Sequence, residues 1–207
     1  MRIGLYGGTF DPPHLGHLHV ARAARDSMQL DVVEMLTSSI PPHRRPTEAD
    51  PFDRFAMTVL AAQDEPRIIP SPREVRRGGV SYTVETLLEL RTKYPGATLF
   101  LVIGADAYDE LPTWHRAGEI LQLAHLAVLP RPGSHGVTAL RPEDRQRLRQ
   151  AGEAGPSEGL AVYQVPMELV PISAREIRRR LRAGEPVDDM VPVPVLRYIR
   201  KRGLYNS

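Results

Sequence analysis

Short apolar runs alternate along this chain with segments whose apolar residues recur at helical spacing. The runs that we expect to form strands cover residues 2–6, 32–36, 67–69, 99–103, 126–129 and 160–165. The expected helices cover residues 18–28, 84–94, 114–123, 142–150, 174–183 and 195–202, and a further helix begins at 50–51. Such alternation is typical of βαβ units, which place their strands side by side in a parallel sheet. It therefore predicts the α/β class.

Local signals mark where several of the helices begin and end. Asp50-Pro51 places an N-cap side chain directly before a proline at the first helical position. Ser173 and Glu176 have the spacing of a capping box, in which each residue satisfies an N–H group of the other. Gly184 follows the helix that this box opens and is expected to end it.

The length favours one domain. The 207 residues fit a single domain over 1–207, with a small helical part at about 173–207 as a C-terminal lobe. We expect helices on both faces of the sheet, because parallel strands are covered by their crossover helices. The proline-rich stretch 38–50 and the polar stretch 70–79 are expected to be loops, and 153–159 a linker.

Composition excludes several classes of protein. The chain has no cysteine, which excludes disulfides, thiolate catalysis and cysteine-based zinc sites. No apolar run approaches the roughly 18 residues of a membrane span, and the N-terminus lacks the apolar stretch of a secretory signal. We therefore expect a cytoplasmic protein without a membrane partner. The net charge of +2 gives no reason to expect a nucleic-acid partner.

The most distinctive segment is GGTFDPPHLGH, residues 7–17, between the first expected strand and the first expected helix. A glycine turn there offers three backbone N–H groups that can point at an anion, those of Gly8, Thr9 and Phe10. The helix behind it presents its positive N-terminal end. His14 and His17 share a face at that helix start, so both rings can donate hydrogen bonds to phosphate oxygens. The segment matches neither a Walker A loop nor the dinucleotide fingerprint.

Two other interpretations of this segment stay open. The first is a tight strand–helix turn with two incidental histidines. The second is a metal site formed by His14, His17 and His19, although His19 would point elsewhere on a helix.

Ligands of parallel sheets bind at the carboxyl ends of the strands, where the strand order reverses. Three loops with unusual residue content follow the carboxyl ends of expected strands, namely residues 7–17, 104–114 and 130–133. We expect these loops to line one crevice.

The segment GGTFDPPHLGH resembles the H-x-G-H nucleotidyltransferases, which share a Rossmann-like fold. The rest of the chain is similar to the nicotinate-mononucleotide adenylyltransferase family of NAD synthesis. The matching motifs run from residue 2 to residue 205 and include PPHR at 41–44, SYT at 81–83, IGAD at 103–106, PTWHR at 112–116, RPG at 131–133, ISAREIR at 172–178 and YIRKRGLY at 198–205. The H-x-G-H segment is specific only to the superfamily, whereas the combination with the other motifs is much more specific.

The resemblance implies roles in ATP binding. Arg178 is expected to bind the phosphates, with Ile172 and Ser173 near the adenosine, at a helix N-terminus that itself favours anions. The role of Arg175 stays open, because the family often has Thr there. The arginines at 179, 180 and 182 are interpreted as a solvated basic face.

Gly104 and Asp106 follow the most apolar expected strand. Gly104 would permit close approach of the backbone to ATP. Asp106 could accept hydrogen bonds from a ribose hydroxyl or orient a hydrated magnesium ion, and it could instead, or also, act as the N-cap of a following helix.

Five further residues are expected to bind the mononucleotide. Trp114, the only tryptophan, could stack on the pyridine ring, although a lone tryptophan is commonly a core residue. Tyr82 and Thr83 could donate to the nicotinate carboxylate, with helix capping as the alternative for Thr83. His43 and Arg44 lie in the proline-rich loop, where Arg44 could bind the mononucleotide phosphate or be a plain exposed charge. Arg131 is a weaker candidate for the adenine side.

The implied reaction joins ATP and nicotinate mononucleotide to give deamido-NAD and pyrophosphate. His14, His17 and Arg178 are the expected catalytic residues. Magnesium is expected to be held mainly by the ATP phosphates, without a protein metal site. The alternatives are another H-x-G-H adenylyltransferase, using nicotinamide mononucleotide or phosphopantetheine, and a non-catalytic nucleotide sensor or nucleic-acid binder. The sequence leaves open a homo-oligomer, closure of the loop at 38–50 and the role of 134–159.

Overall fold

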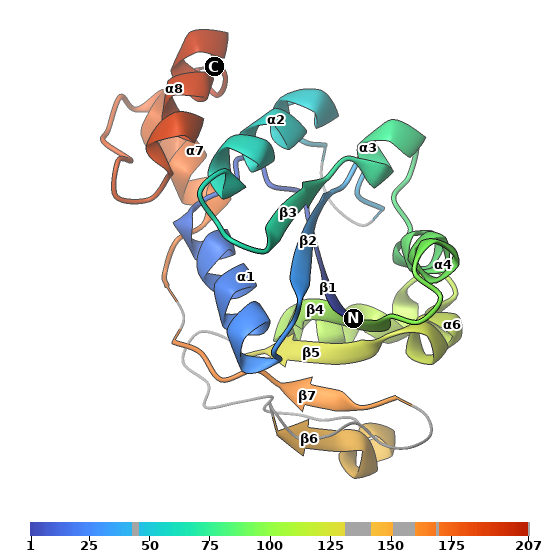
Figure 1. Cartoon of the computed structure of the whole chain (residues 1–207). Coiled ribbons are helices and arrows are strands. Elements are labelled where there is room, and N and C mark those ends of the chain that lie inside the picture. The colour runs from blue at the N-terminus through green and yellow to red at the C-terminus, as the bar shows by residue number, and fades with distance from the viewer. Residues whose placement is uncertain (43–45, 131–141, 151–159, 169, 207) are drawn as a thin grey trace. The chain divides into compact units, whose positions relative to one another are not determined.

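The computed structural model describes residues 1–42, 46–130, 142–150, 160–168 and 170–206 (Figure 1). The strands are β1 (Arg2–Gly8), β2 (Val32–Thr37), β3 (Ile68–Ser71), β4 (Thr98–Gly104), β5 (His125–Leu129), β6 (Leu148–Gln150) and β7 (Val162–Gln164). The α-helices are α1 (Leu15–Ser27), α2 (Pro51–Ala62), α3 (Arg73–Arg77), α4 (Thr83–Lys93), α5 (Ala105–Glu110), α6 (Ala117–Leu123), α7 (Ala174–Arg182) and α8 (Val193–Arg202). Two short 3₁₀ segments, η1 (Leu111–Thr113) and η2 (Pro142–Arg147), complete the described elements.

The strands follow the order β3-β2-β1-β4-β5-β7-β6 in one sheet. The pairs β1–β4, β4–β5, β5–β7 and β6–β7 are parallel. The order reverses between β1 and β4, where Tyr6 is in register with Val102. Because β1 and β4 are parallel, their carboxyl ends lie at the same edge of the sheet, the edge at which such sheets bind ligands. The predicted α/β class with a Rossmann-like parallel sheet is confirmed.

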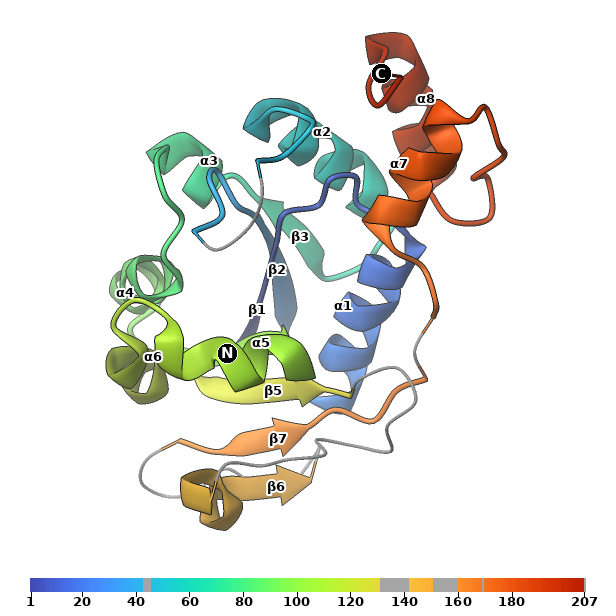
Figure 2. The same cartoon turned by 180° about the vertical axis from the view of Figure 1, so that it is seen from behind.

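The chain forms two compact units, each built from several stretches of sequence. Unit 1 consists of residues 1–7, 20–34 and 82–169. Its core is β4, whose residues Leu99 to Ile103 are all buried. Figures 1 and 2 both show α4 beside α6. Arg91 ties these elements together, because its guanidinium donates to the carbonyl oxygens of Leu123 and Ala97.

Unit 2 consists of residues 8–19, 35–81 and 170–207, so it contains the bend after β1 and both C-terminal helices. Its centre is α2, which packs on α8, α3 and β3. The Asp50 carboxylate caps α2 by accepting from the N–H groups of Phe52 and Asp53, as predicted. Tyr198 of α8 donates its hydroxyl to Asp53 Oδ1 at 2.6 Å, which fixes α8 on α2. That the whole chain is a single domain stays a prediction.

Three local predictions are wrong in part. The expected loop at 70–79 contains α3, a single turn of helix that ends at Gly78 with φ of +71°. The expected helix at 142–150 is η2 followed by β6, because residues 148–150 pair with β7 and this pairing overrides local helix propensity. The expected helix at 114–123 begins only at Ala117, since Arg116 has a left-handed backbone with φ of +54°.

Among the described residues, no helix has both the length and the apolar character needed to span a bilayer.

Candidate active site

The bend after β1 depends on Gly8 and Phe10, both in unit 2. Phe10 has φ of +50°, and its buried ring lies close to Gly8 and makes a T-shaped contact with the His17 ring, with centroids 5.0 Å apart. A Cβ atom at Gly8 would lie 2.6 Å from Phe10 Cε1, so only glycine fits. At Gly7 a Cβ would meet nothing within 4 Å, so packing does not require glycine there.

The bend is stabilised by Arg54, a buried residue that sequence reasoning missed. Its guanidinium is fully buried and donates to four backbone carbonyl oxygens, those of Thr9 at 2.7 Å, Ser38 at 2.7 Å, Ser39 at 2.8 Å and Ala49 at 3.1 Å. Burial lowers the pKa of Arg54, and the negative charge of Asp11 opposes that change. Arg54 thereby fixes the carbonyl side of the turn that carries Thr9.

Asp11 holds the same bend through its carboxylate. The buried carboxylate accepts from the backbone N–H groups of Glu48 at 2.8 Å and Ala49 at 3.2 Å, and from the Tyr205 hydroxyl at 2.6 Å. Burial and the neighbouring Asp11 raise the pKa of Tyr205, so the hydroxyl stays protonated and remains a donor. The peptide bond from Asp11 to Pro12 is cis.

His14 and His17 form a stacked pair at the start of α1, with ring centroids 3.6 Å apart. The backbone N–H of His14 donates to His17 Nδ1 at 3.2 Å, so His17 closes the first turn as the Glu of a capping box would. Because Nδ1 accepts this bond, the proton of the neutral His17 ring is on Nε2. His17 therefore offers an Nε2–H donor from the helix start.

His14 is the buried partner in this pair and is 6% exposed. Its Nδ1 atom has no hydrogen-bond partner within the part of the chain that the structure describes. Burial lowers the pKa of His14 from 6.5 to about 4, so the ring is neutral at pH 7. Gly16 permits this packing, because a Cβ there would lie 3.1 Å from two atoms of the His14 ring.

Arg178 reaches the bend from α7. Its Nη1 donates to the backbone oxygen of Asp11 at 2.6 Å, and its Nε donates to Glu48 Oε1 at 2.7 Å. Ile172 also lies near the start of α1, since a Cβ built on Gly16 would be 3.7 Å from Ile172 Cβ. Unit 2 thus brings together the residues predicted for phosphate binding and catalysis: Gly8, Thr9, Phe10, His14, His17, Ile172, Ser173 and Arg178.

Only one of the two hydrogen bonds predicted for the capping box at the start of α7 forms. Ser173 Oγ accepts from the N–H of Glu176 at 3.3 Å. The Glu176 side chain instead accepts from Arg179 and Arg180, which lowers its pKa to about 2. Arg179 also pairs with Glu185 at 2.8 Å, and Arg182 pairs with Glu48. The arginines predicted to form a solvated basic face are therefore paired with carboxylates.

The other predicted site residues that the structure describes belong to unit 1. Gly104 is the exposed N-cap of α5, and Asp106 is exposed in the first turn of that helix, so Asp106 is not the N-cap. Thr83 is the first residue of α4, whose N-cap is Tyr82, so the capping alternative for Thr83 is wrong.

Trp114 is half-buried and caps the end of η1, so it lies outside α6, although the expected helix at 114–123 included it. The ring that packs on Tyr82 belongs to His115, with centroids 4.3 Å apart. Sequence reasoning missed His115, although the PTWHR motif contains it. His43, Arg44 and Arg131 lie outside the described residues, so their predicted roles are not located.

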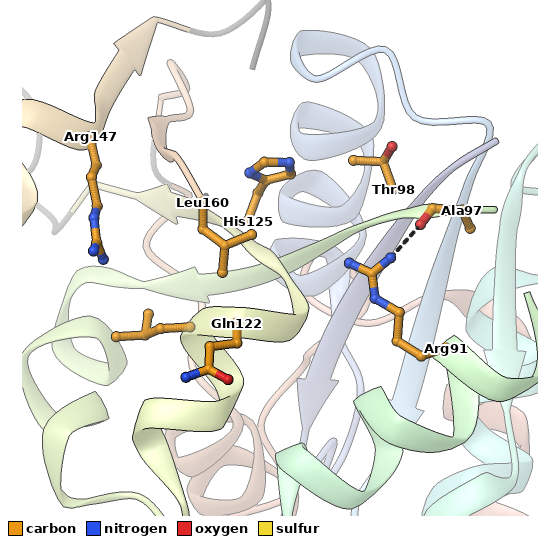
Figure 3. A pocket seen from close by; sticks show the side chains of 8 residues that line it. Arg91, Ala97, Thr98, Gln122, His125, Arg147 and Leu160 are labelled. Atoms are coloured by element: carbon orange, nitrogen blue, oxygen red, sulfur yellow. Dashed lines mark hydrogen bonds between the residues drawn. The ribbon is translucent and has the colours of Figure 1, made fainter. Parts of the chain in front are cut away.

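A separate cavity of about 570 Å³ lies at the amino ends of β4 and β5, away from Gly104 (Figure 3). It is lined by Arg91, Ala97, Thr98, Leu121, Gln122, His125, Arg147 and Leu160. His125 Nδ1 accepts from the Ala161 N–H at 3.0 Å, and Arg91 is bound to carbonyl oxygens. None of the predicted site residues within the described ranges lines it.

The described residues contain no group of three His, Asp or Glu side chains suited to hold a metal ion. The alternative of a histidine metal site is further disfavoured by the His14–His17 pair, because stacked rings with His17 Nδ1 already engaged do not converge on one ion.

Comparisons with known proteins identify relatives along the whole chain. Residues 5–180 match the cytidylyltransferase-like family. A Pseudomonas fluorescens protein named "Probable nicotinate-nucleotide adenylyltransferase" is 39% identical over 216 residues, covering 100% of this chain and 98% of its own length. A Thermus thermophilus protein with the same name is 40% identical over 208 residues, with 100% of both chains covered.

The fold matches a solved structure as well. The nicotinic acid mononucleotide adenylyltransferase of Plasmodium falciparum complexed with NaAD has a TM-score of 0.72 at 17% identity. The match covers 99% of this chain and 97% of that one, and at this identity it shows the shared fold. Together with the full-length relatives and the H-x-G-H bend, these matches establish that the chain belongs to the cytidylyltransferase-like family and, within it, to the nicotinate-nucleotide adenylyltransferases, which are nucleotidyltransferase enzymes.

Proposed function

We propose that this enzyme transfers the AMP part of ATP to nicotinate mononucleotide, giving deamido-NAD and pyrophosphate, a step of NAD biosynthesis. The observation that carries the proposal is the His14–His17 pair at the start of α1, in which the bond from the His14 N–H leaves His17 with an Nε2–H donor. The names of the full-length relatives support the same acceptor.

In the proposed reaction, a 5′-phosphate oxygen of the mononucleotide attacks the α-phosphorus of ATP. One P–O bond forms there while the bond from the α-phosphorus to the bridging oxygen of pyrophosphate breaks. A phosphate monoester has a second pKa of about 6, so the nucleophile is already largely ionised at neutral pH. No general base is needed, and the work of the enzyme is to align two anions and to stabilise the charge of the transferring group.

We assign that work to the elements of unit 2. The backbone N–H groups of Gly8, Thr9 and Phe10, with the N-terminal end of α1, would hold the phosphates. His17 would donate from Nε2 to the α-phosphoryl oxygens, and neutral His14 would add a second donor without a net charge. Arg178 would bind the phosphates, and Ile172 and Ser173 would lie near the adenosine.

We assign binding of the mononucleotide to residues of unit 1 and to two further residues, His43 and Arg44, which lie outside the described ranges. Trp114 would stack on the pyridine ring, and Tyr82 and Thr83 would donate to its carboxylate. His43 and Arg44 stay candidates for the mononucleotide phosphate. His115 packs on Tyr82 and would hold the tyrosine in place. Gly104 and Asp106 are assigned to ATP, with Asp106 facing a ribose hydroxyl.

Magnesium is proposed to be the metal ion of the reaction. We expect this ion to be held by phosphate oxygens and water rather than by a protein cage. When bound, it would neutralise charge on the pyrophosphate leaving group. Orienting this hydrated ion is the alternative role for the exposed Asp106 carboxylate, in place of the ribose contact. The cytoplasmic location, the absence of a nucleic-acid partner and a homo-oligomer stay predictions.

The test is pyrophosphate release from Mg-ATP, measured in parallel with nicotinate mononucleotide, nicotinamide mononucleotide and phosphopantetheine. We expect release with nicotinate mononucleotide at a kcat/KM at least tenfold above the other two acceptors. Preference for either of the others would refute the proposed acceptor. No release with any of them, from a folded protein that binds ATP, would favour a non-catalytic nucleotide-binding protein.

A further inference from the structure

The Glu48 carboxylate is hydrogen-bonded to Arg178, the arginine that we assign to the ATP phosphates. Glu48 Oε1 accepts from Arg178 Nε at 2.7 Å, and Glu48 Oε2 accepts from Arg182 Nη2. The Glu48 side chain is 35% exposed and that of Arg178 only 21%. The contact is therefore partly shielded from water, which strengthens it relative to a fully exposed ion pair.

The contact has the chemistry of an arginine–phosphate interaction. Two oxygens that share one negative charge accept from two neighbouring guanidinium groups, as two oxygens of a phosphate would. Partial burial of Glu48 acts to raise its pKa, but the bonds from Arg182 and Arg178 outweigh it and hold the pKa below its ordinary value. Glu48 is therefore ionised at neutral pH. It takes up donor capacity of Arg178 that the triphosphate would otherwise use.

The backbone keeps the Glu48 carboxylate at this position. The Glu48 N–H donates to Asp11 Oδ2 at 2.8 Å, and the next N–H, that of Ala49, donates to Asp11 Oδ1. Arg178 also donates, through Nη1, to the backbone carbonyl oxygen of Asp11. The backbone of Glu48 is thus tied to Asp11, and the contact with Arg178 is made by the Glu48 side chain alone.

We propose that Glu48 occupies the phosphate position on Arg178 when ATP is absent, and that the phosphates of ATP displace it on binding. This inference rests on the proposed function, because it needs Arg178 to bind ATP. Glu48 then sets the affinity for ATP by competition, since each binding event must break its contacts with Arg178 and Arg182. It has no part in binding the mononucleotide.

The test is Glu48→Gln, which removes the charge while keeping the size of the side chain and the backbone bond to Asp11. We expect KM for ATP and the Kd of a non-hydrolysable ATP analogue, measured by calorimetry, to fall about two- to five-fold, the range of one partly exposed ion pair. KM for nicotinate mononucleotide should be unchanged. Glu48→Ala should act in the same direction, because glutamine can still accept one bond from arginine.

Glu185→Gln is the matched control. It also removes one carboxylate that accepts from an arginine of α7, but that arginine is Arg179 and not Arg178. We expect it to leave the affinity for ATP unchanged. Unfolding curves would establish that each variant is folded. An unchanged or weaker affinity in both Glu48 variants, or an equal gain in Glu185→Gln, would overturn the inference. Failure of the proposed function is distinguishable, because the unaltered enzyme would then form no deamido-NAD.

Discussion

The buried His14 ring should make folding sensitive to mild acid. Its pKa is about 4 in the folded chain and near 6.5 in the unfolded chain. Between these values the unfolded chain takes up a proton that the folded chain does not. The stabilising contribution is therefore complete above about pH 6.5 and is lost progressively as the pH falls toward 4.

The gap of about 2.5 pH units between these pKa values corresponds to about 3 kcal/mol of unfolding free energy, at about 1.36 kcal/mol for each unit. This is a large share of the roughly 5–15 kcal/mol by which domains are stable. The cause is burial, since a charged His14 would lack water to solvate it.

The perturbation is His14→Asn, measured by urea unfolding at half-unit steps from pH 7 to pH 4. Other groups also titrate in this range, but they contribute equally to both proteins, so the difference between the two profiles isolates His14. We expect the parent to lose about 3 kcal/mol more than the variant across the window. Parallel profiles, or an NMR titration of the His14 ring with a midpoint near 6.5, would refute the reasoning.

Three further predictions concern single side chains. His17→Ala should lower kcat by about a hundredfold or more, because it removes a donor to the transferring phosphoryl group, while KM for the mononucleotide changes little; turnover within a few-fold of the parent would exclude this role. Trp114→Ala should chiefly raise KM for the mononucleotide in steady-state assays, and an unchanged KM would remove Trp114 from the site. Gly8→Ala should lower the unfolding free energy by about 1–3 kcal/mol in urea titrations, because its Cβ would strike the Phe10 ring; a variant as stable as the parent would contradict this packing.

The sequence was sufficient for the elements whose cause is local. The α2 start follows from Asp50 and Pro51, and the buried face of α1 follows from Leu18, Ala21 and Ala24 at helical spacing. The sequence also marked the segment after β1 as a candidate phosphate cradle. The left-handed residue of the bend is Phe10, whereas Gly7 and Gly8 belong to β1, and the cradle itself stays a prediction.

What the sequence could not show depends on contacts between distant residues. Arg54 looks like an ordinary surface arginine of an amphipathic helix, and only the folded chain places the carbonyl oxygens of Thr9, Ser38 and Ser39 around it. Glu48 meets Arg178 from 130 residues away. Such partners have no sequence periodicity, so one sequence without relatives gives no signal for them.

Local propensity also misled where tertiary pairing decides the outcome. Residues 148–150 have helix-compatible composition, yet they form β6 because β7 offers an edge for parallel pairing. At Glu176 the capping-box prediction failed in one half, because Arg179 and Arg180 compete for the carboxylate. Both errors arise where a stronger partner is available to a residue than the local motif assumes.

The central claim is that the AMP part of ATP is moved onto the phosphate of nicotinate mononucleotide, and the direct measurement is to follow a label. With ATP labelled at the α-phosphorus, all transferred label should appear in deamido-NAD and none in pyrophosphate. Label that stays in ATP, or that appears as free AMP at the same rate with and without the mononucleotide, would contradict the account.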